Sequence, residues 1–149
     1  QGEAAFADGF AEAQQALLGT VVLKSEPAIL SYEDLGAYKY LLRVALDGGI
    51  RDATVDAVGR LAEYDGQRGS QLVQTLEEFL RRHGNISATS EALFVHPNTL
   101  RQRLRRIAEL SGLDLRRDDW LMIEIAVKMV KLEQALGSAE SRPGSSSGP

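Results

Sequence analysis

The apolar residues of the chain recur mainly three and four positions apart, the spacing that predicts amphipathic helices. In the first half, this spacing and one short apolar run predict a helix over residues 3–24, a strand over 28–32, a helix opening at Glu33–Asp34 and a helix over 52–62. Asp47–Gly48–Gly49 breaks the second of these helices, and Tyr64–Asp65–Gly66 ends the third. We therefore place a domain boundary near Gly66, after a partial α/β fragment.

The second half of the chain predicts four further helices with clear start and stop signals. They cover residues 69–83, a short stretch ending at Phe94, residues 97–110 and residues 118–136. Ser87 is the expected N-cap of the short helix, and His96–Pro97 combines a cap with a proline suited to the first helical position. The chain is thus expected to be mainly α, with domains over 1–66 and 67–137 and a disordered Ser/Gly/Pro-rich tail over 138–149.

The composition limits the chemistry that the chain could perform. Its 149 residues include no Cys and two His, which excludes a disulfide framework and a Cys-based zinc site and argues against a His-rich metal site. No apolar run approaches the roughly 18 residues that a membrane span needs. We expect a cytoplasmic protein with no metal, no cofactor and no membrane partner. No set of nucleophile, base and oxyanion donor can be assembled, so we do not expect an enzyme.

The formal net charge of −4 argues against a nucleic-acid partner until the charge is divided by region. Residues 1–80 carry a net charge of −7 and residues 118–149 carry −2. Between them, residues 81–117 hold eight arginines against three carboxylates, a net charge of +5. Every basic residue of this basic segment is Arg, whose planar fork fits phosphates and guanine edges. The segment fits a nucleic-acid interface, and a solvated helix face is the alternative.

The order of elements in the basic segment predicts a helix-turn-helix. A short helix and a tight turn precede a longer Arg-rich helix, which in such motifs enters the major groove of DNA. At about 100° per residue, Leu100, Leu104 and Ile107 fall on one side of the helix over residues 97–111. The opposite side carries polar residues, namely Asn98, Arg101, Gln102, Arg105 and Glu109. The helix therefore has separate core and reading faces.

The exposed residue types match the hydrogen-bonding groups of base edges. Arg fits guanine O6 and N7, and Asn or Gln fits adenine N6 and N7, so the candidate base readers are Asn98, Arg101, Gln102 and Arg105. Arg103 and Arg106 flank this face and would meet phosphates. The backbone N–H groups of Asn98 and Thr99, in the first turn, would also bond a phosphate. Simple helix initiation is the alternative for Asn98 and Thr99.

Three strings of the basic segment resemble the C-terminal helix-turn-helix of PucR/CdaR-type bacterial transcription regulators. They are Gly84–Thr89, Leu93–Leu100 and Arg103–Ile107. The resemblance continues upstream through Tyr64–Asp65, Gly69 and Thr75–Leu76, and downstream through Gly112–Leu115. Residues 1–62, with Tyr32–Gly36, look like the closing part of the GGDEF-like domain that precedes this helix-turn-helix in such regulators.

The resemblance implies sequence-specific binding to double-stranded DNA and regulation of transcription. It also implies that a small-molecule effector is sensed N-terminal to this segment, outside the chain. Two residues depart from the family pattern: Pro97 stands where many members carry Arg, and Gln102 where Tyr is common. The first departure removes one phosphate contact, and the second alters base or backbone reading.

Several other residues have a functional and a structural interpretation. His96 would be a metal ligand or general base, but its place before Pro97 favours a helix cap. His83, beside Gly84, is expected to interact with a helix C-terminus. The pairs Glu77–Glu78 and Asp118–Asp119 would be catalytic carboxylates, but they line or open helices, so a helix-dipole or solvated role is favoured.

The last predicted helix is apolar on more than one face, from Leu121 to Leu132. A helix of this kind is buried on several sides. The structural interpretation is a core helix, and the functional one is the seam of a homodimer that binds paired half-sites. The main rival to DNA binding is a protein-interaction or oligomerisation module in which the Arg-rich helix docks on an acidic partner.

Overall fold

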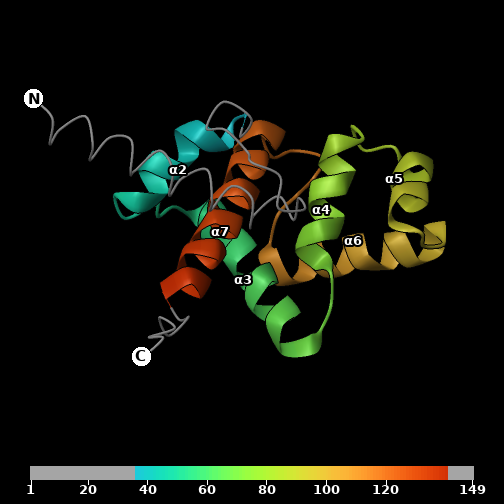
Figure 1. Cartoon of the computed structure of the whole chain (residues 1–149). Coiled ribbons are helices and arrows are strands. Elements are labelled where there is room, and N and C mark those ends of the chain that lie inside the picture. Colours follow the sequence, from blue (N-terminus) through green and yellow to red (C-terminus); the bar gives the residue numbers. More distant parts are fainter. Residues whose placement is uncertain (1–35, 141–149) are drawn as a thin grey trace, which may run out of the picture. The chain divides into compact units, whose positions relative to one another are not determined.

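The computed structural model describes residues 36–140, and the side chains of residues 36–137. These residues fall into two compact units, which we describe separately. One comprises residues 51–130, and the other contains residues 36–50 together with residues 131–140. Every regular element in the described part of the chain is a helix (Figure 1). The mainly α expectation is therefore confirmed there, whereas the predicted helix over 3–24 and strand over 28–32 lie outside the described residues.

The smaller unit contains α2, Tyr38–Leu46, which was predicted from its apolar spacing. Tyr38, Leu42 and Ala45 are buried, and their spacing puts them on one face of the helix. The helix ends at Asp47, where Gly48 and Gly49 have φ values of 108° and 78°. The predicted break at these residues is thus confirmed. Glycine is suited to them because it adopts positive φ angles without the steric cost of a side chain.

In the larger unit, α3 spans Ala53–Arg68 and is capped by Asp52, whose carboxylate accepts the Val55 N–H at 2.8 Å. The predicted end at Tyr64–Gly66 is wrong, because the helix continues to a left-handed cap at Gly69, with φ 65°. Asp65 lies inside α3 and accepts hydrogen bonds from the N–H groups of the next helix. The assignment of residues 1–66 and 67–137 to different domains stays a prediction.

The next helix, α4, spans Leu72–Arg81 and buries the predicted stripe of Leu72, Leu76, Phe79 and Leu80. It is shorter than the predicted 69–83. Asp65 fixes its start by accepting the N–H groups of Leu72 and Val73 at 2.8 and 2.9 Å. His83 and Gly84 end it with φ values of 53° and 76°. A Cβ at Gly84 would lie 2.8 Å from the indole of Trp120, so this position has no room for a side chain.

The helix-turn-helix consists of α5, Ile86–Leu93, and α6, Pro97–Ser111. The predicted Ser87 cap is wrong: Asn85 caps α5 by accepting the Ala88 N–H at 2.9 Å. The predicted signals for α6 are confirmed. His96 Nδ1 accepts the Asn98 N–H at 3.1 Å, and Gly112 ends the helix with φ 74°.

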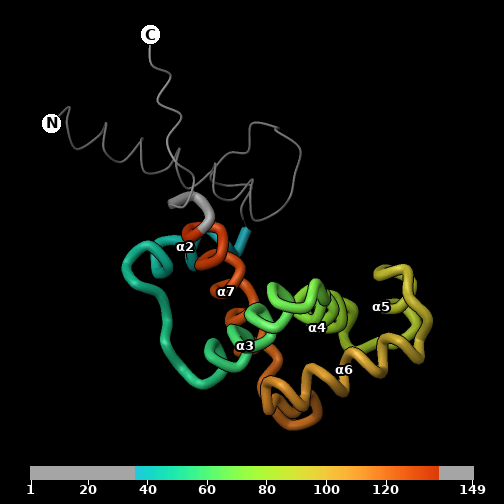
Figure 2. Tube along the Cα trace, turned by 90° about the horizontal axis from the view of Figure 1, so that it is seen from below, coloured from blue at the N-terminus to red at the C-terminus, as the bar shows by residue number. Residues whose placement is uncertain are grey.

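The last helix, α7, spans Trp120–Glu140. It extends beyond the predicted end at residue 136, and residues 138–140 of the predicted tail are helical, whereas residues 141–149 lie outside the described part. In the larger unit α7 buries Ile123, Ala126 and Val127. Helix α6 contacts α3, α4 and α5, so three helices fix its position (Figures 1 and 2).

Candidate nucleic-acid interface

Helices α5 and α6 are joined by a turn of residues 94–96, and local hydrogen bonds fix this turn. The N–H of Val95 donates to the Ser90 carbonyl at 3.0 Å. Ser90 and Thr89 are buried, and their hydroxyls donate to the carbonyls of Ser87 and Asn85. The two hydroxyl bonds satisfy buried polar groups within α5, and the Val95 bond ties the turn to the end of that helix.

Helix α6 separates its core and solvent faces as predicted. Leu100 and Ile107 are fully buried, and Ser111 is buried with its hydroxyl bonded to the Ile107 carbonyl. Leu104 is half-buried. The opposite face is exposed and carries Asn98, Arg101, Gln102, Arg105 and Glu109. A row of long polar side chains is thus presented to solvent on a helix that is anchored by its core side.

The candidate base readers differ in how they are held. Arg101 donates to the amide oxygen of Asn98 at 3.2 Å, so these two side chains orient each other. Gln102 and Arg105 have no side-chain partner within residues 36–137. The Asn98 N–H already donates to His96, whereas Thr99 is half-exposed in the same turn. Of the two amides predicted to meet a phosphate, that of Asn98 is therefore occupied.

The two arginines predicted to flank the reading face contact their own chain. Arg103 is half-buried and donates to the hydroxyl of Thr75 in α4 at 3.4 Å. Arg106 pairs with Glu109 at 3.3 Å, donates to the Tyr64 hydroxyl at 3.3 Å and lies over the Tyr64 ring at 5.2 Å. The hydrogen bond with Tyr64, followed by that with Glu109, raises the pKa of Arg106, which stays charged at every pH of interest.

Arg60 of α3 positions α6 and was not identified from the sequence. Its guanidinium donates to the carbonyls of Ser111 and Leu110, at 2.9 and 3.4 Å. These carbonyls belong to the last turn of α6, where the helix leaves acceptors unpaired and a partial negative charge accumulates. The contact joins residues about 50 positions apart in the chain, so no local pattern could have predicted it.

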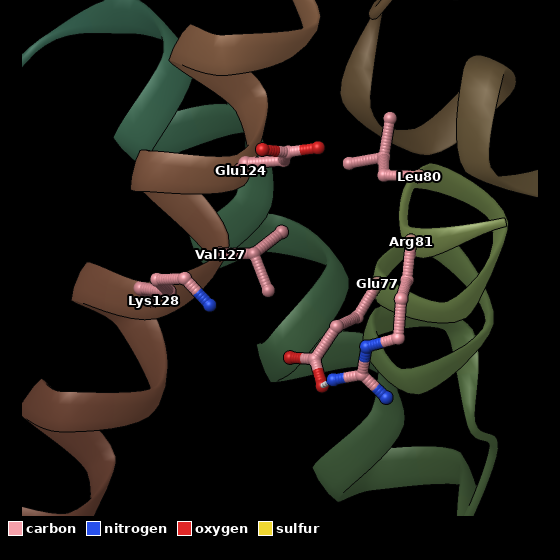
Figure 3. A pocket seen from close by; sticks show the side chains of 6 residues that line it. All are labelled: Glu77, Leu80, Arg81, Glu124, Val127 and Lys128. Carbon is pink, nitrogen blue, oxygen red and sulfur yellow. Dashed lines mark hydrogen bonds and ion pairs between the residues drawn. The ribbon is translucent and has the colours of Figure 1, made fainter. Parts of the chain in front are cut away.

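The first arginines of the basic segment are neutralised by neighbouring carboxylates. Arg81 pairs with Glu77 at 3.2 Å and with Glu78 at 2.9 Å, and Arg82 pairs with Glu78 at 3.0 Å. Figure 3 shows Arg81 turned toward Glu77 at a small pocket between α4 and α7. Glu77 and Glu78 precede residue 81, so the net charge of +5 overstates the positive charge available around α4.

A hollow of about 710 Å³ lies beside α6 in the larger unit. Arg105 and Arg116 both line it, and its apolar wall includes Leu104 and Trp120. The Arg116 side chain has no partner within the described side chains. The sequence placed Arg116 in the basic segment but not among the site residues, and the fold brings it next to the exposed face of α6.

The residues with catalytic alternatives have structural roles. His96 caps α6, Asp118 accepts the Asp114 N–H at 2.7 Å, and Asp119 accepts the Leu121 N–H at 2.9 Å. Glu77 and Glu78 form ion pairs with Arg81. The described residues contain no group of three or more His, Cys, Asp or Glu side chains that could hold a metal ion. No helix in residues 36–140 is both long and apolar enough to span a membrane.

Comparison with known proteins agrees with this geometry. Residues 72–129 match the model of the PucR C-terminal helix-turn-helix domain. The chain is 39% identical over 101 residues to the carbohydrate diacid regulator of Escherichia coli (strain K12), covering 66% of this chain and 25% of that protein. It is 32% identical over 88 residues to the DNA-binding transcriptional activator AdeR of Bacillus subtilis (strain 168), covering 59% and 21%.

A third relative matches over a longer stretch. The chain is 31% identical over 126 residues to the purine catabolism regulatory protein of Bacillus subtilis (strain 168), covering 84% of this chain and 23% of that protein. The chain thus spans about a fifth to a quarter of the length of these relatives. No solved structure matches. The anchoring of α6 by three helices, its exposed polar face and the matched residues lead to one conclusion: residues 72–129 form a helix-turn-helix domain of the PucR C-terminal type.

Proposed function

We propose that this chain is a DNA-binding output module that regulates transcription, with α6 in the major groove of duplex DNA. One observation carries the proposal: the exposed face of α6 presents Asn98, Arg101, Gln102 and Arg105 on a helix anchored through buried Leu100 and Ile107. These residue types can form bidentate hydrogen bonds with base edges. A rigid support matters because sequence reading depends on holding such side chains in register with the bases.

We divide the contacts into two groups. Arg105 and Gln102 read bases, because neither side chain is engaged within the described residues, and the Asn98–Arg101 pair reads the bases next to them. Arg103, Arg106 and the Thr99 N–H meet phosphates, with Arg106 aligned by Tyr64. Arg116 adds a phosphate contact, because it borders the same hollow as Arg105. Phosphate contacts fix the register of the protein on DNA, and base contacts select the sequence.

We also propose that the protein acts as a homodimer through α7. Leu121 and Met122, near the start of α7, are 62% and 45% exposed, whereas Ile123, Ala126 and Val127 are buried in their own unit. The exposed pair supports a small apolar contact at this end of α7, in place of a seam along the whole helix. Paired helix-turn-helix units would then read two half-sites.

In this proposal the part before α3 belongs to the end of a GGDEF-like domain, and an effector is sensed elsewhere in a longer protein. The 126-residue match to the purine catabolism regulatory protein supports a related segment upstream, because it is too long to be confined to residues 67–149. A structure of the chain with its natural N-terminal extension would test this assignment. A helical-only arrangement before α3 would contradict it.

The central test is selection of binding sites from random duplexes with the full chain, followed by footprinting at physiological salt. We expect a recurring half-site sequence, and an affinity that falls steeply as salt rises because phosphate contacts release counterions. A flat salt response, or no selected sequence, would contradict the proposal. In that case the Arg-rich face would instead serve an acidic protein partner.

A further inference from the structure

Phe94, in the turn between α5 and α6, is exposed to an extent unusual for an aromatic side chain. Its exposed fraction is 95%, compared with 70% for Tyr40 and 62% for Leu121, the next most exposed large apolar residues in the described part of the chain. A side chain in this position buries almost no area and therefore contributes almost nothing to the stability of the fold.

The backbone of Phe94 is also strained. Its φ of 55° lies in the left-handed region, where an L side chain crowds the backbone and glycine does not. The residue is the C-cap of α5, and in the same unit α3 and α6 use Gly69 and Gly112 for this role. Phenylalanine at such a cap therefore costs stability relative to glycine without any packing in return. Strain of this kind is characteristic of functional positions.

The position of Phe94 places it close to the DNA-reading end of α6. It lies three residues before Pro97, the first residue of α6, which corresponds to a chain length of about 10 Å. The N-terminal residues of a recognition helix are the ones that approach base edges. The Phe94 N–H donates to the Glu91 carbonyl at 3.2 Å, and the following Val95 N–H donates to Ser90. The backbone that carries the ring is thus held by hydrogen bonds at this end of α6.

We infer that Phe94 makes an apolar contact with duplex DNA at the edge of the bases read by the first turn of α6. Two parts of a duplex present apolar surface to such a ring: the 5-methyl group of thymine in the major groove and the faces of the deoxyribose rings. This inference rests on the proposed function, because the ring has DNA as its partner only if α6 lies in the major groove. Phe94 would then be an apolar contact beside the polar base readers of α6, which were identified by matching side chains to the hydrogen-bonding groups of base edges.

The test compares Phe94→Gly with the unsubstituted chain in two measurements. Removing the side chain relieves the left-handed strain, so the thermal midpoint should rise by about 2–8 °C. Removing the apolar contact should weaken binding to the selected site by about 5- to 30-fold, measured by fluorescence anisotropy of a labelled duplex. Opposite signs in the two measurements separate a DNA contact from a structural role, which would lower both stability and affinity.

His83→Gly is the matched control. His83 is the other non-glycine residue with positive φ in the described part of the chain, and it is also exposed. It should gain a similar few degrees in thermal midpoint, which measures the effect of relieving left-handed strain at an exposed position. Because His83 also lines the hollow beside Arg105 and Arg116, this variant is a control for the thermal midpoint alone. Phe94→Tyr, which keeps the ring, should retain the affinity of the unsubstituted chain to within about threefold. Loss of affinity in Phe94→Tyr as large as in Phe94→Gly would count against a ring contact.

Replacing single thymines of the selected site by deoxyuridine distinguishes the two apolar sources, because only the methyl group is lost. If the ring meets a thymine methyl, one substitution weakens the unsubstituted chain but not Phe94→Gly. If it meets deoxyribose, no deoxyuridine position depends on Phe94, and Phe94→Gly loses affinity for all duplexes alike. Equal affinity of Phe94→Gly and the unsubstituted chain would overturn the inference. Absence of DNA binding by the unsubstituted chain would instead overturn the proposed function.

Discussion

The arginines at the end of α4 and those on the exposed face of α6 belong to one basic segment, yet their surroundings differ. Arg81 and Arg82 are paired with Glu77 and Glu78 one turn earlier in the same helix. Arg105 has no partner within the described residues, and Arg101 contacts only the neutral amide of Asn98 among them. The difference teaches that the charge of a segment does not locate its positive surface, because the carboxylates that cancel it lie outside the segment.

A third group of arginines lies between these extremes. Arg60, Arg103 and Arg106 each contact groups far away in the sequence, namely the last carbonyls of α6, Thr75 and Tyr64. These contacts hold α6 against α3 and α4, and the guanidinium groups still add positive charge beside α6. Measuring the free energy of unfolding and the affinity for DNA on the same variants would separate the three groups.

The largest effect is expected for Arg105→Ala. The variant should lose about 1–3 kcal/mol of binding free energy on the selected site and should discriminate less at one base position. Its free energy of unfolding should change by less than about 0.5 kcal/mol, because the exposed Arg105 side chain has no hydrogen-bond or ion-pair partner within the described residues. Isothermal titration on matched and mismatched duplexes checks both values. Equal weakening on all sequences would make Arg105 a phosphate contact.

Arg60→Ala should show the reverse behaviour. Its two hydrogen bonds to the end of α6 are partly exposed, so their loss should lower the free energy of unfolding by about 1 kcal/mol. Urea denaturation measures this change. Well below the thermal midpoint, the folded variant should bind the selected site with unchanged sequence preference. An altered sequence preference with an unchanged free energy of unfolding would show that Arg60 contacts DNA and does not only support α6.

Arg116→Gln should produce a smaller and sequence-independent effect. Loss of one phosphate contact should reduce the slope of log affinity against log salt by about 1 and leave the selected sequence unchanged. Binding measured at several salt concentrations gives the slope. An unchanged slope would show that Arg116 lies outside the DNA interface. The arginines that contact DNA would then be those of α6 alone.

The smallest effect is expected for Arg81→Gln. An exposed ion pair on a helix contributes about 0–1 kcal/mol, and Arg81 is 59% exposed. Unfolding and DNA binding should both change by less than about 0.5 kcal/mol. A decrease of the salt slope as large as that of Arg116→Gln would show that the paired arginines of α4 also reach DNA, and it would remove the distinction drawn above.

The sequence predicted α6 better than the elements around it, because its limits depend on local chemistry. His96, Pro97 and Gly112 act within one turn of the residues that they affect, and the buried positions follow from the helical repeat. The end of α3 was missed because Asp65, interpreted as a turn residue, stays in the helix and caps α4 with its carboxylate. The Asn85 cap was missed because Ser87, also a good cap residue, follows two positions later.

The candidate site was predictable as a face but not as a set of roles. Helical geometry identified which α6 side chains are exposed. It placed Arg103 and Arg106 at the flanks of this face, but it could not predict their contacts with Thr75 and Tyr64, which are 28 and 42 residues away in the chain. The apolar spacing predicted that the short helix ends at Phe94, but it contained no signal for the exposure of this side chain.

Trp120 is the single tryptophan of the chain, and its surroundings make it an optical probe of the interface. Its indole packs against Phe79, with ring centroids 5.7 Å apart, and donates to the Leu115 carbonyl at 2.8 Å. The ring also lines the hollow that Arg105 and Arg116 border. All intrinsic tryptophan emission therefore originates beside the two arginines proposed to meet DNA. A duplex that binds there should change the emission intensity or its accessibility to acrylamide, so unlabelled DNA can be titrated directly.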